Sequence, residues 1–425
     1  MIKFKLLIDN IFIVKVLIEM YVSKIRVKNF KTFNDVCLDL NKFNVLIGAC
    51  GSGKTNFIQV FELLNDISYN FHEAIKKHGG SYVKNFNLLE NNLESCIEVK
   101  LSDIDKSINA GSNKDIMLLF NHIDYEICFN FYQNECKVQN ELVKLSCNVK
   151  HANNQKIDEN EIIIKNNDGE MTVEFLNDLD DLEISEIIPD TLVDIVSQNF
   201  KKVNSPIINS ALATIPIEWG NLFKNISDYD FDPKFCKNLN NFNNNEELTK
   251  YGENLLFVLK NILNDETKKK EFLIYYTNML PYIKDVSVEK ILDEERIFMI
   301  VEKYNDVKIP APFISDGSST LMAILIALYF QDNEILLIEE PERHIHPSLI
   351  NQLILMMESV DKQVIITTHS PELLKYSELE DILFIYREND GFSRIDRVID
   401  NDVVKAFIDE LGVDSVFVND YLGLR

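Results

Sequence analysis

The residues with the clearest chemistry form a glycine-rich stretch at positions 44–56, which reads Asn-Val-Leu-Ile-Gly-Ala-Cys-Gly-Ser-Gly-Lys-Thr-Asn. Within it, the pattern G-x-x-x-x-G-K-[ST] of a phosphate-binding loop is filled by Gly48, Gly53, Lys54 and Thr55. Glycine suits such a loop because a residue without a Cβ adopts positive φ at little cost, which lets backbone N–H groups turn towards an anion. The stretch therefore predicts a binding site for phosphate groups.

The cation and the hydroxyl of this loop indicate ATP with Mg²⁺ as the ligand. We expect Lys54 to reach the β- and γ-phosphates and the Thr55 hydroxyl to bind the Mg²⁺ between them. The N-terminal end of the next helix carries a partial positive charge that faces the same phosphates. Gly51, Ser52 and Asn56 complete the set of predicted ATP-binding residues.

Hydrophobic residues on both sides distinguish this loop from a chance glycine turn. Residues 45–47 are Val-Leu-Ile, which is typical of a strand buried in a parallel sheet. Beyond the loop, apolar side chains recur at helical spacing at Phe57, Val60, Phe61 and Leu64. The sequence thus predicts a strand, a loop and a helix from Lys54 to about Ser68.

Two further positions place polar side chains at the ends of apolar strands. Glu339 and Glu340 follow the apolar run 335–338, and because successive strand residues point to opposite sides, the two acids must face different neighbours. One could approach Mg²⁺ and the other the attacking water. Adjacent acids are common on surfaces, but after a buried strand in a chain with a phosphate loop they favour ATP chemistry. His369 follows the strand predicted at 364–368, at the end where open α/β sheets bind ligands.

A polar, glycine-containing segment opens a helix that is otherwise apolar. Residues 315–319 read Ser-Asp-Gly-Ser-Ser, and the helix predicted at 320–330 is apolar on nearly every face, so it must be buried. Ser318 or Ser319 is expected to cap this helix. Its free N–H groups would face whatever lies beyond its start.

Composition describes a globular chain with room for more than one domain. The chain has 425 residues, 46% of them hydrophobic, and a net charge of −25, so its average field repels polyanions and charge does not indicate DNA binding. A local basic strip at Lys24, Arg26, Lys28 and Lys31 alternates with apolar residues, which favours a solvated strand face.

Cysteine usage and the N-terminal stretch indicate a reduced, cytoplasmic protein. The 7 cysteines form no C-x-x-C pair and no regular framework, so neither zinc nor disulfides are expected. Residues 1–19 are apolar, but charged side chains interrupt them too often for a membrane span. We interpret these residues as an upstream extension or a misassigned start.

Taken together, these motifs in this order resemble ATP-binding-cassette (ABC) type ATPases of the SMC and RecF kind. More closely, they resemble bacterial AAA-type ATPases related to the ATPase half of the overcoming-lysogeny-defect (OLD) nucleases. The resemblance rests on the phosphate loop (Walker A), the signature at 314–317, the Walker B and D-loop segment at 340–347 and the switch segment at 368–371. It implies an α/β fold, a P-loop NTPase of ABC/SMC-head type with a mixed α+β insertion domain.

The resemblance also implies a division of labour. Glu339 would be the Mg²⁺-side acid, Glu340 would polarise the attacking water and His369 would sense the γ-phosphate. Ser315 and Gly317 would contact ATP held by a second protomer, which implies a homodimer through the ATPase heads.

The same resemblance suggests how the chain is divided. Residues 1–19 would precede the domain proper, 20–100 would be the N-terminal part of the head with the phosphate loop, 101–281 an inserted domain, and 282–425 the C-terminal part of the head. Glu342, His344 and His346 could suggest a metal site, but no third nitrogen or sulfur ligand is spaced nearby, so a D-loop turn is expected.

Two functions from different classes fit these motifs. In the first, ATP-driven dimerisation and hydrolysis gate a partner or a DNA-related process, such as repair or anti-phage defence. In the alternative, the chain is an ATP-gated module with little turnover that works with a separately encoded nuclease. The presence of Glu340 and His369 favours the first. A nuclease acting alone is disfavoured, because the stretch after His369 is too short for the Toprim domain of OLD proteins.

Overall fold

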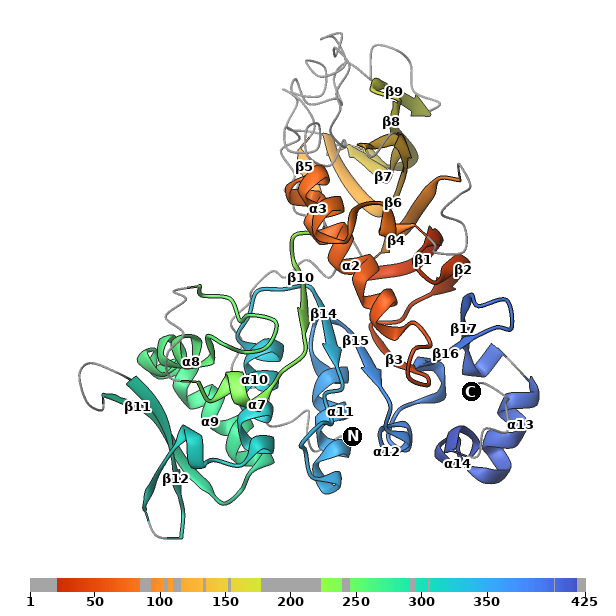
Figure 1. Cartoon of the computed structure of the whole chain (residues 1–425). Coiled ribbons are helices and arrows are strands. Elements are labelled where there is room, and N and C mark those ends of the chain that lie inside the picture. The colour runs from red at the N-terminus through yellow and green to blue at the C-terminus, as the bar shows by residue number, and fades with distance from the viewer. Residues whose placement is uncertain are drawn as a thin grey trace.

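Two large β-sheets and one three-stranded sheet organise the chain (Figure 1). The computed structural model describes residues 21–84, 93–102, 106–109, 116–132, 135–151, 154–176, 223–238, 245–290, 296–304, 306–400 and 402–418. The expected N-terminal extension, residues 1–19, lies outside the described residues.

The central sheet has six strands in the order β10-β14-β15-β3-β16-β17. Their bounds are β3 Phe43–Ile47, β10 Ile226–Tyr229, β14 Ile335–Glu339, β15 Gln363–Thr368, β16 Ile382–Arg387 and β17 Ser393–Arg397. The first five run parallel, and β17 is antiparallel to β16. The strands predicted around the phosphate loop, the two acids and the histidine are confirmed as neighbours in one sheet.

Both faces of the central sheet are buried, which explains its continuous apolar runs. Alternate residues of β14 belong to two different hydrophobic clusters, one on each face. Helix α2 (Lys54–Tyr69) contributes to the first cluster, and α10 (Asp316–Tyr329) and α11 (Pro347–Ser359) contribute to the second. A strand covered on both sides has no polar face to display, so the sequence shows no alternation there.

Helix α10 begins earlier than the sequence pattern predicts. It starts at Asp316, and its N-cap is Ser315, whose Oγ accepts a hydrogen bond of 3.2 Å from the N–H of Ser318. The expected cap at Ser318 or Ser319 is therefore wrong. Ser315 takes the cap because its backbone is still extended, while Asp316 places a carboxylate in the first turn, where the helix dipole favours it. Most of the helix is buried, as its apolar pattern predicts.

The second large sheet is antiparallel and starts from the N-terminal strands. Its order is β2-β1-β4-β6-β7-β8-β9, and β5 pairs with β6. The bounds are β1 Tyr21–Phe30, β2 Phe33–Asp39, β4 Ser95–Ser102, β5 Lys106–Asn109, β6 Ile116–Tyr132, β7 Glu135–His151, β8 Asn154–Asn167 and β9 Glu170–Leu176. One face of this sheet packs against α2, within the same cluster that covers the first face of the central sheet.

Smaller elements complete the described fold. The three-stranded antiparallel sheet consists of β11 Ile283–Lys290, β12 Arg296–Glu302 and β13 Lys308–Pro310. Further helices are α3 Phe71–Lys77, α7 Pro233–Cys236, α8 Leu255–Asn264, α9 Glu266–Met279, α12 Pro371–Leu374, α13 Asp402–Leu411 and α14 Val413–Val418, with 3₁₀ turns η1 Gly80–Val83, η5 Ala311–Phe313, η6 Leu379–Asp381 and η7 Val398–Asp400. Among the described residues, we find no helix that has both the length and the apolar character needed to cross a bilayer.

The observed strand pairing does not follow the boundaries that we expected for an inserted domain at residues 101–281. It crosses both of them. Strands β5–β9 continue the sheet that β1, β2 and β4 begin, so they form no sheet of their own. At the other end, β10 pairs in parallel with β14, and α8 and α9 share a hydrophobic cluster with α10. Sequence texture cannot reveal such pairing, because it joins segments far apart in the chain. We propose instead that the head resumes at β10 rather than at residue 282.

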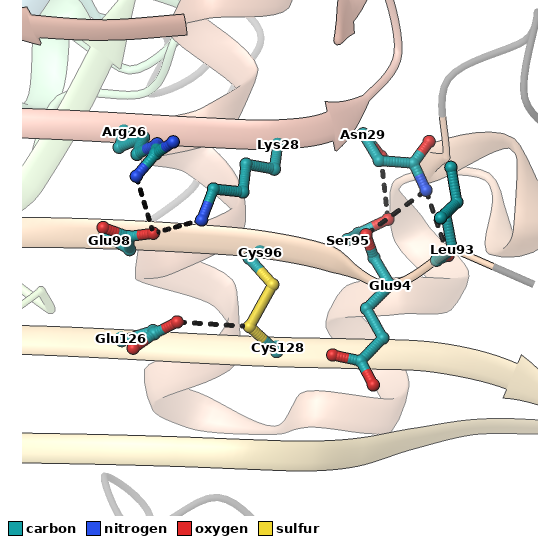
Figure 2. The surroundings of a disulfide bond; sticks show 10 residues. All are labelled: Arg26, Lys28, Asn29, Leu93, Glu94, Ser95, Cys96, Glu98, Glu126 and Cys128. Carbon is teal, nitrogen blue, oxygen red and sulfur yellow. Dashed lines mark hydrogen bonds and ion pairs between the residues drawn. A yellow bond between two sulfur atoms is a disulfide. The ribbon is translucent and has the colours of Figure 1, made fainter. Parts of the chain in front are cut away.

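A disulfide joins two strands of the antiparallel sheet, between Cys96 on β4 and Cys128 on β6 (Figure 2). The two cysteines are direct partners in the strand register. The expectation that the cysteines form no disulfide is therefore wrong. The bonded residues are 32 positions apart, and only the register of β4 against β6 brings them together. The remaining cysteines are free, namely Cys37, Cys50, Cys136, Cys147 and Cys236.

We predict that the double substitution Cys96→Ser/Cys128→Ser lowers the free energy of unfolding by about 2–4 kcal/mol, because the crosslink constrains the unfolded chain. Urea unfolding without reductant measures the change. Cys37→Ser is the matched control, since that thiol is free and exposed. Equal stability of the double variant and the wild type, together with peptide mass spectra that lack the crosslink, would contradict the prediction.

Candidate active site

Three predicted motifs meet at one edge of the central sheet. Gly48 directly follows β3, Glu339 is the last residue of β14, and His369 directly follows β15. These strands are adjacent and parallel, and the last residue of β3 lies beside the last residue of β15. Since carboxyl ends of parallel strands share an edge, segments far apart in the sequence come together in space.

The conformation of the loop explains its glycines. Gly51 and Gly53 have φ values of 76° and 116°, which side chains with a Cβ rarely adopt. A Cβ on Gly48 would lie 2.1 Å from the backbone oxygen of Ile385 on β16, so close approach also requires glycine there. The loop can therefore keep its backbone N–H groups turned inwards.

A hydrogen-bonded series links the phosphate loop to the acids. The buried ammonium of Lys54 donates to the carbonyl oxygens of Gly48 (2.6 Å) and Ala49 (3.0 Å) and lies 3.2 Å from Nδ1 of His369. On the other side of the ring, Nε2 of His369 lies 3.2 Å from Oε1 of Glu340. If Nδ1 accepts from the ammonium, the ring proton is on Nε2 and is directed at Glu340. Burial lowers the pKa of Lys54, and nearby acidic groups oppose that shift.

Glu339 faces the hydroxyl that is predicted to bind Mg²⁺. Its Oε2 lies 3.3 Å from the Thr55 hydroxyl, and its Oε1 lies 3.8 Å from the ammonium of Lys250. Burial raises the pKa of Glu339, and Lys250 counteracts this by favouring the ionised carboxylate. The two oxygens of this acid are thus turned towards different neighbours.

Glu340 contacts different neighbours from Glu339, and the backbone turns sharply at this residue, just after the strand. Its φ is 46°, in the left-handed region, and its N–H donates to the carbonyl of Thr367 at 2.8 Å. A non-glycine residue in this region is strained by an amount on the order of 1 kcal/mol. The turn directs one carboxylate oxygen at His369 and the other to within 3.5 Å of Nε of Arg343.

Two other loop residues differ in what their side chains contact. Ser52 is buried, and its Oγ has no hydrogen-bond partner among the described residues. Asn56 donates a hydrogen bond of 2.9 Å from Nδ2 to the Thr32 hydroxyl, so its side chain ties the helix start to the turn between β1 and β2.

The predicted signature residues do not join this constellation within one chain. The hydroxyl of Ser315 contacts Ser318, with its N–H at 3.2 Å and its Oγ at 2.6 Å, and none of the contacts described for it reaches the phosphate loop. Gly317 packs against the D-loop, where an added Cβ would come within 2.4 Å of the backbone oxygen of His344. Both residues mark the exposed start of α10.

The D-loop residues that could suggest a metal site have other partners. Glu342 accepts a hydrogen bond of 2.5 Å from the Thr368 hydroxyl, and His346 caps helix α11 through its Nδ1. Among the described residues, the group with metal-ligand spacing is Glu94 with Cys96 and Cys128, whose sulfur atoms are bonded to each other. The structure thus agrees with a D-loop turn.

Sequence reasoning missed several residues around the site. Lys250 and Arg343 contact the two acids, as described above. Ser393 on β17 donates to the Ser52 carbonyl at 2.6 Å, and Arg387 at the end of β16 donates to the Gly51 carbonyl at 3.2 Å. The position of Arg387 at a strand end was a usable signal, whereas Lys250 lies in a loop without any motif.

The loop fits a nucleotide phosphate, and the acids fit its metal ion. The unpartnered Ser52 hydroxyl and the Lys54 ammonium supply donors for an anion, and the positive φ angles of Gly51 and Gly53 are those that a phosphate-binding backbone nest needs. The oxygens of Thr55 and Glu339, 3.3 Å apart, are the kind of ligands that Mg²⁺ prefers.

The chain is similar to a described protein family over part of its length. A family model described as "AAA domain, putative AbiEii toxin, Type IV TA system" matches residues 213–375. The matched region contains β10, the signature, the two acids and His369. The phosphate loop lies outside it, so the loop motif is an observation independent of the family match.

Individual relatives are distant. An uncharacterized protein of Methanocaldococcus jannaschii is 26% identical over 150 residues, which are 31% of this chain and 39% of that protein, so the match spans well under half of the relative. Among solved structures, an SMC head bound to the C-winged helix domain of ScpA has a TM-score of 0.44 and 14% identity, covering 88% of this chain and 97% of that one. The SMC head domain from Thermotoga maritima has a TM-score of 0.38 and 13% identity, covering 89% and 98%.

The chain is thus similar to the AAA-domain family over residues 213–375, and its phosphate loop lies at the edge of a parallel sheet, as in P-loop nucleotide-binding folds.

Proposed function

We propose that this chain binds ATP with Mg²⁺ at the phosphate loop and hydrolyses the γ-phosphate. The observation that carries the proposal is the series from Lys54 through His369 to Glu340. It places a cation for the phosphates and a carboxylate for the attacking water on either side of one histidine. Such a series would connect the presence of phosphate to the position of the general base.

Each residue has a separate task in the proposed reaction. Lys54 binds the β- and γ-phosphates, and Glu340 orients the attacking water and accepts its proton. His369 would hold Glu340 through Nε2 and would sense the γ-phosphate through the Lys54 ammonium at its Nδ1. Thr55 and Glu339 would hold Mg²⁺, which would neutralise phosphate charge when bound.

The active unit in this proposal is a homodimer. Ser315 and Gly317 lie at the start of α10, and their contacts stay within that region of their own chain. A second protomer would bring its α10 start to the γ-phosphate, where N–H groups of a helix terminus favour an anion. ATP binding would then close the dimer, and hydrolysis would reopen it.

The process served by this cycle is proposed from resemblance to OLD-type ATPases alone. Closure of the heads would gate a cytoplasmic partner, such as a separately encoded nuclease in DNA repair or anti-phage defence. The net charge of −25 gives no support for a DNA coat on the chain itself, so a partner would supply the contact with DNA.

We predict that Lys54→Ala abolishes ATP binding, because it removes the ammonium that contacts the Gly48 and Ala49 carbonyls and can meet the phosphates. Isothermal titration of the purified variant with ATP measures the loss. Lys270→Ala, an exposed lysine on α9, is the control and should bind as the wild type does. Wild-type affinity in Lys54→Ala would exclude the loop as the nucleotide site.

Glu340→Gln should keep ATP binding but slow hydrolysis by a factor on the order of 10²–10⁴, the usual contribution of a positioned base. It should therefore accumulate an ATP-bound dimer on size-exclusion chromatography. Glu339→Gln is the comparison, and trapping by that variant instead would reverse the two roles. Equal and very slow turnover in wild type and Glu340→Gln would support the ATP-gated module with little turnover.

Ser315→Arg should spare ATP binding to the monomer but block dimer closure and turnover. Ser315→Ala is the matched control, because it removes only the N-cap and should cost about 1 kcal/mol of stability. Mixing Ser315→Arg with Lys54→Ala subunits should recover one composite site from the two intact halves. No recovered hydrolysis, despite heterodimers in native mass spectra, would count against independent composite sites. Full activity of Ser315→Arg alone would remove the dimer mechanism.

A further inference from the structure

We infer that Lys250 is a positioning residue that holds the carboxylate of Glu339 in its metal-binding orientation. This inference rests on the proposed ATPase function and deepens it, because it names the group that prepares the Mg²⁺ side of the site. Lys250 belongs to none of the motifs that predict the site, and it reaches Glu339 from the loop between α7 and α8.

The loop that carries Lys250 is fastened along the end of strand β10. The carbonyl of Lys250 accepts a hydrogen bond of 2.9 Å from the N–H of Asp230, and the carbonyl of Tyr251 accepts one of 3.3 Å from Asp232. Strand β10 in turn pairs with β14, which ends at Glu339. The backbone of Lys250 is therefore fixed relative to the acid that its side chain approaches.

The side chain of Lys250 is surrounded by carboxylates from three elements. Its Nζ lies 2.6 Å from Oε1 of Glu62 on α2, 2.5 Å from Oδ2 of Asp228 on β10 and 3.8 Å from Oε1 of Glu339. Burial opposes the charge on Lys250, but the contacts with Asp228 and Glu62 raise its pKa above that of an ordinary lysine. The ammonium thus stays charged, and its two short contacts hold it in place.

In this arrangement, the two carboxylate oxygens of Glu339 contact different groups. Lys250 lies on the Oε1 side, while Oε2 faces the Thr55 hydroxyl at 3.3 Å, where Mg²⁺ is expected. Without the ammonium, Glu62, Asp228 and Glu339 would form a partly buried group of like charges. Like charges at this spacing repel each other and move apart, and a shifted Glu339 would be a weaker metal ligand.

Positioning differs from a simple charge effect, and the two predict opposite results. If Lys250 acted only by repelling a nearby metal ion, its removal would strengthen metal binding. If it positions Glu339, its removal weakens metal binding, because partners of metal ligands typically contribute about 10–100-fold in affinity.

The test uses the full chain with ATP and Mn²⁺, which binds oxygen ligands as Mg²⁺ does and is visible by electron paramagnetic resonance. We expect Lys250→Met to weaken Mn²⁺ binding to the protein–ATP complex by about tenfold or more. ATP binding measured in EDTA should stay unchanged, because it depends on Lys54. Lys250→Arg should restore most of the Mn²⁺ affinity. Lys284→Met, which removes an exposed ion pair with Asp306, is the control.

A second variant keeps the test valid if Lys250→Met does not fold. Lys250→Met/Asp228→Asn removes one cation and one carboxylate together, so it leaves the local net charge unchanged, and it should also bind Mn²⁺ weakly. Wild-type or tighter Mn²⁺ binding in a folded variant without Lys250 would overturn the inference while leaving the proposed ATPase intact. Failure of the wild type to bind ATP would instead contradict the proposed function.

Discussion

The parallel pairing of β3, β15 and β14 is the constraint on which the rest of the site depends. Because these strands run in the same direction, their carboxyl ends share one edge of the sheet. The residues that follow them therefore lie close together in space although they are far apart in the sequence. Burial of both sheet faces makes this register unambiguous, since a shift by one residue would exchange the side chains that fill the two hydrophobic clusters. Packing of the two sheet faces thereby fixes which residues meet at the site.

Each of the two acids at this edge lies near a cation that also contacts an aspartate. Lys250 lies between Asp228 and Glu339, and Arg343 lies between Asp230 and Glu340. A partly buried carboxylate is expensive unless a cation or hydrogen-bond donor compensates it. Asp228 on β10 and Asp230 just after its end therefore support the two acids, each through one intermediate cation. The left-handed turn at Glu340 completes the separation of the two acids.

In the proposed dimer, the start of α10 would meet the nucleotide of the partner protomer. Ser315 caps the helix and Gly317 packs on the D-loop, so both residues are engaged by their own chain in ways that leave the helix start at the surface. A cap and a ligand contact are compatible, because one serine oxygen satisfies a single N–H and leaves others of the first turn available. Local stability and an intermolecular role can thus reside in one residue.

Local features of the sequence determined the phosphate loop, the strands around it and the buried character of α10. These depend on residue type and short-range spacing, which the chain displays without folding. Only the tertiary structure decided the partners of β10, the disulfide between Cys96 and Cys128 and the contact of Lys250 with Glu339. Each of these joins segments distant in sequence, and its existence depends on strand register and packing, for which neighbouring residues carry no signal.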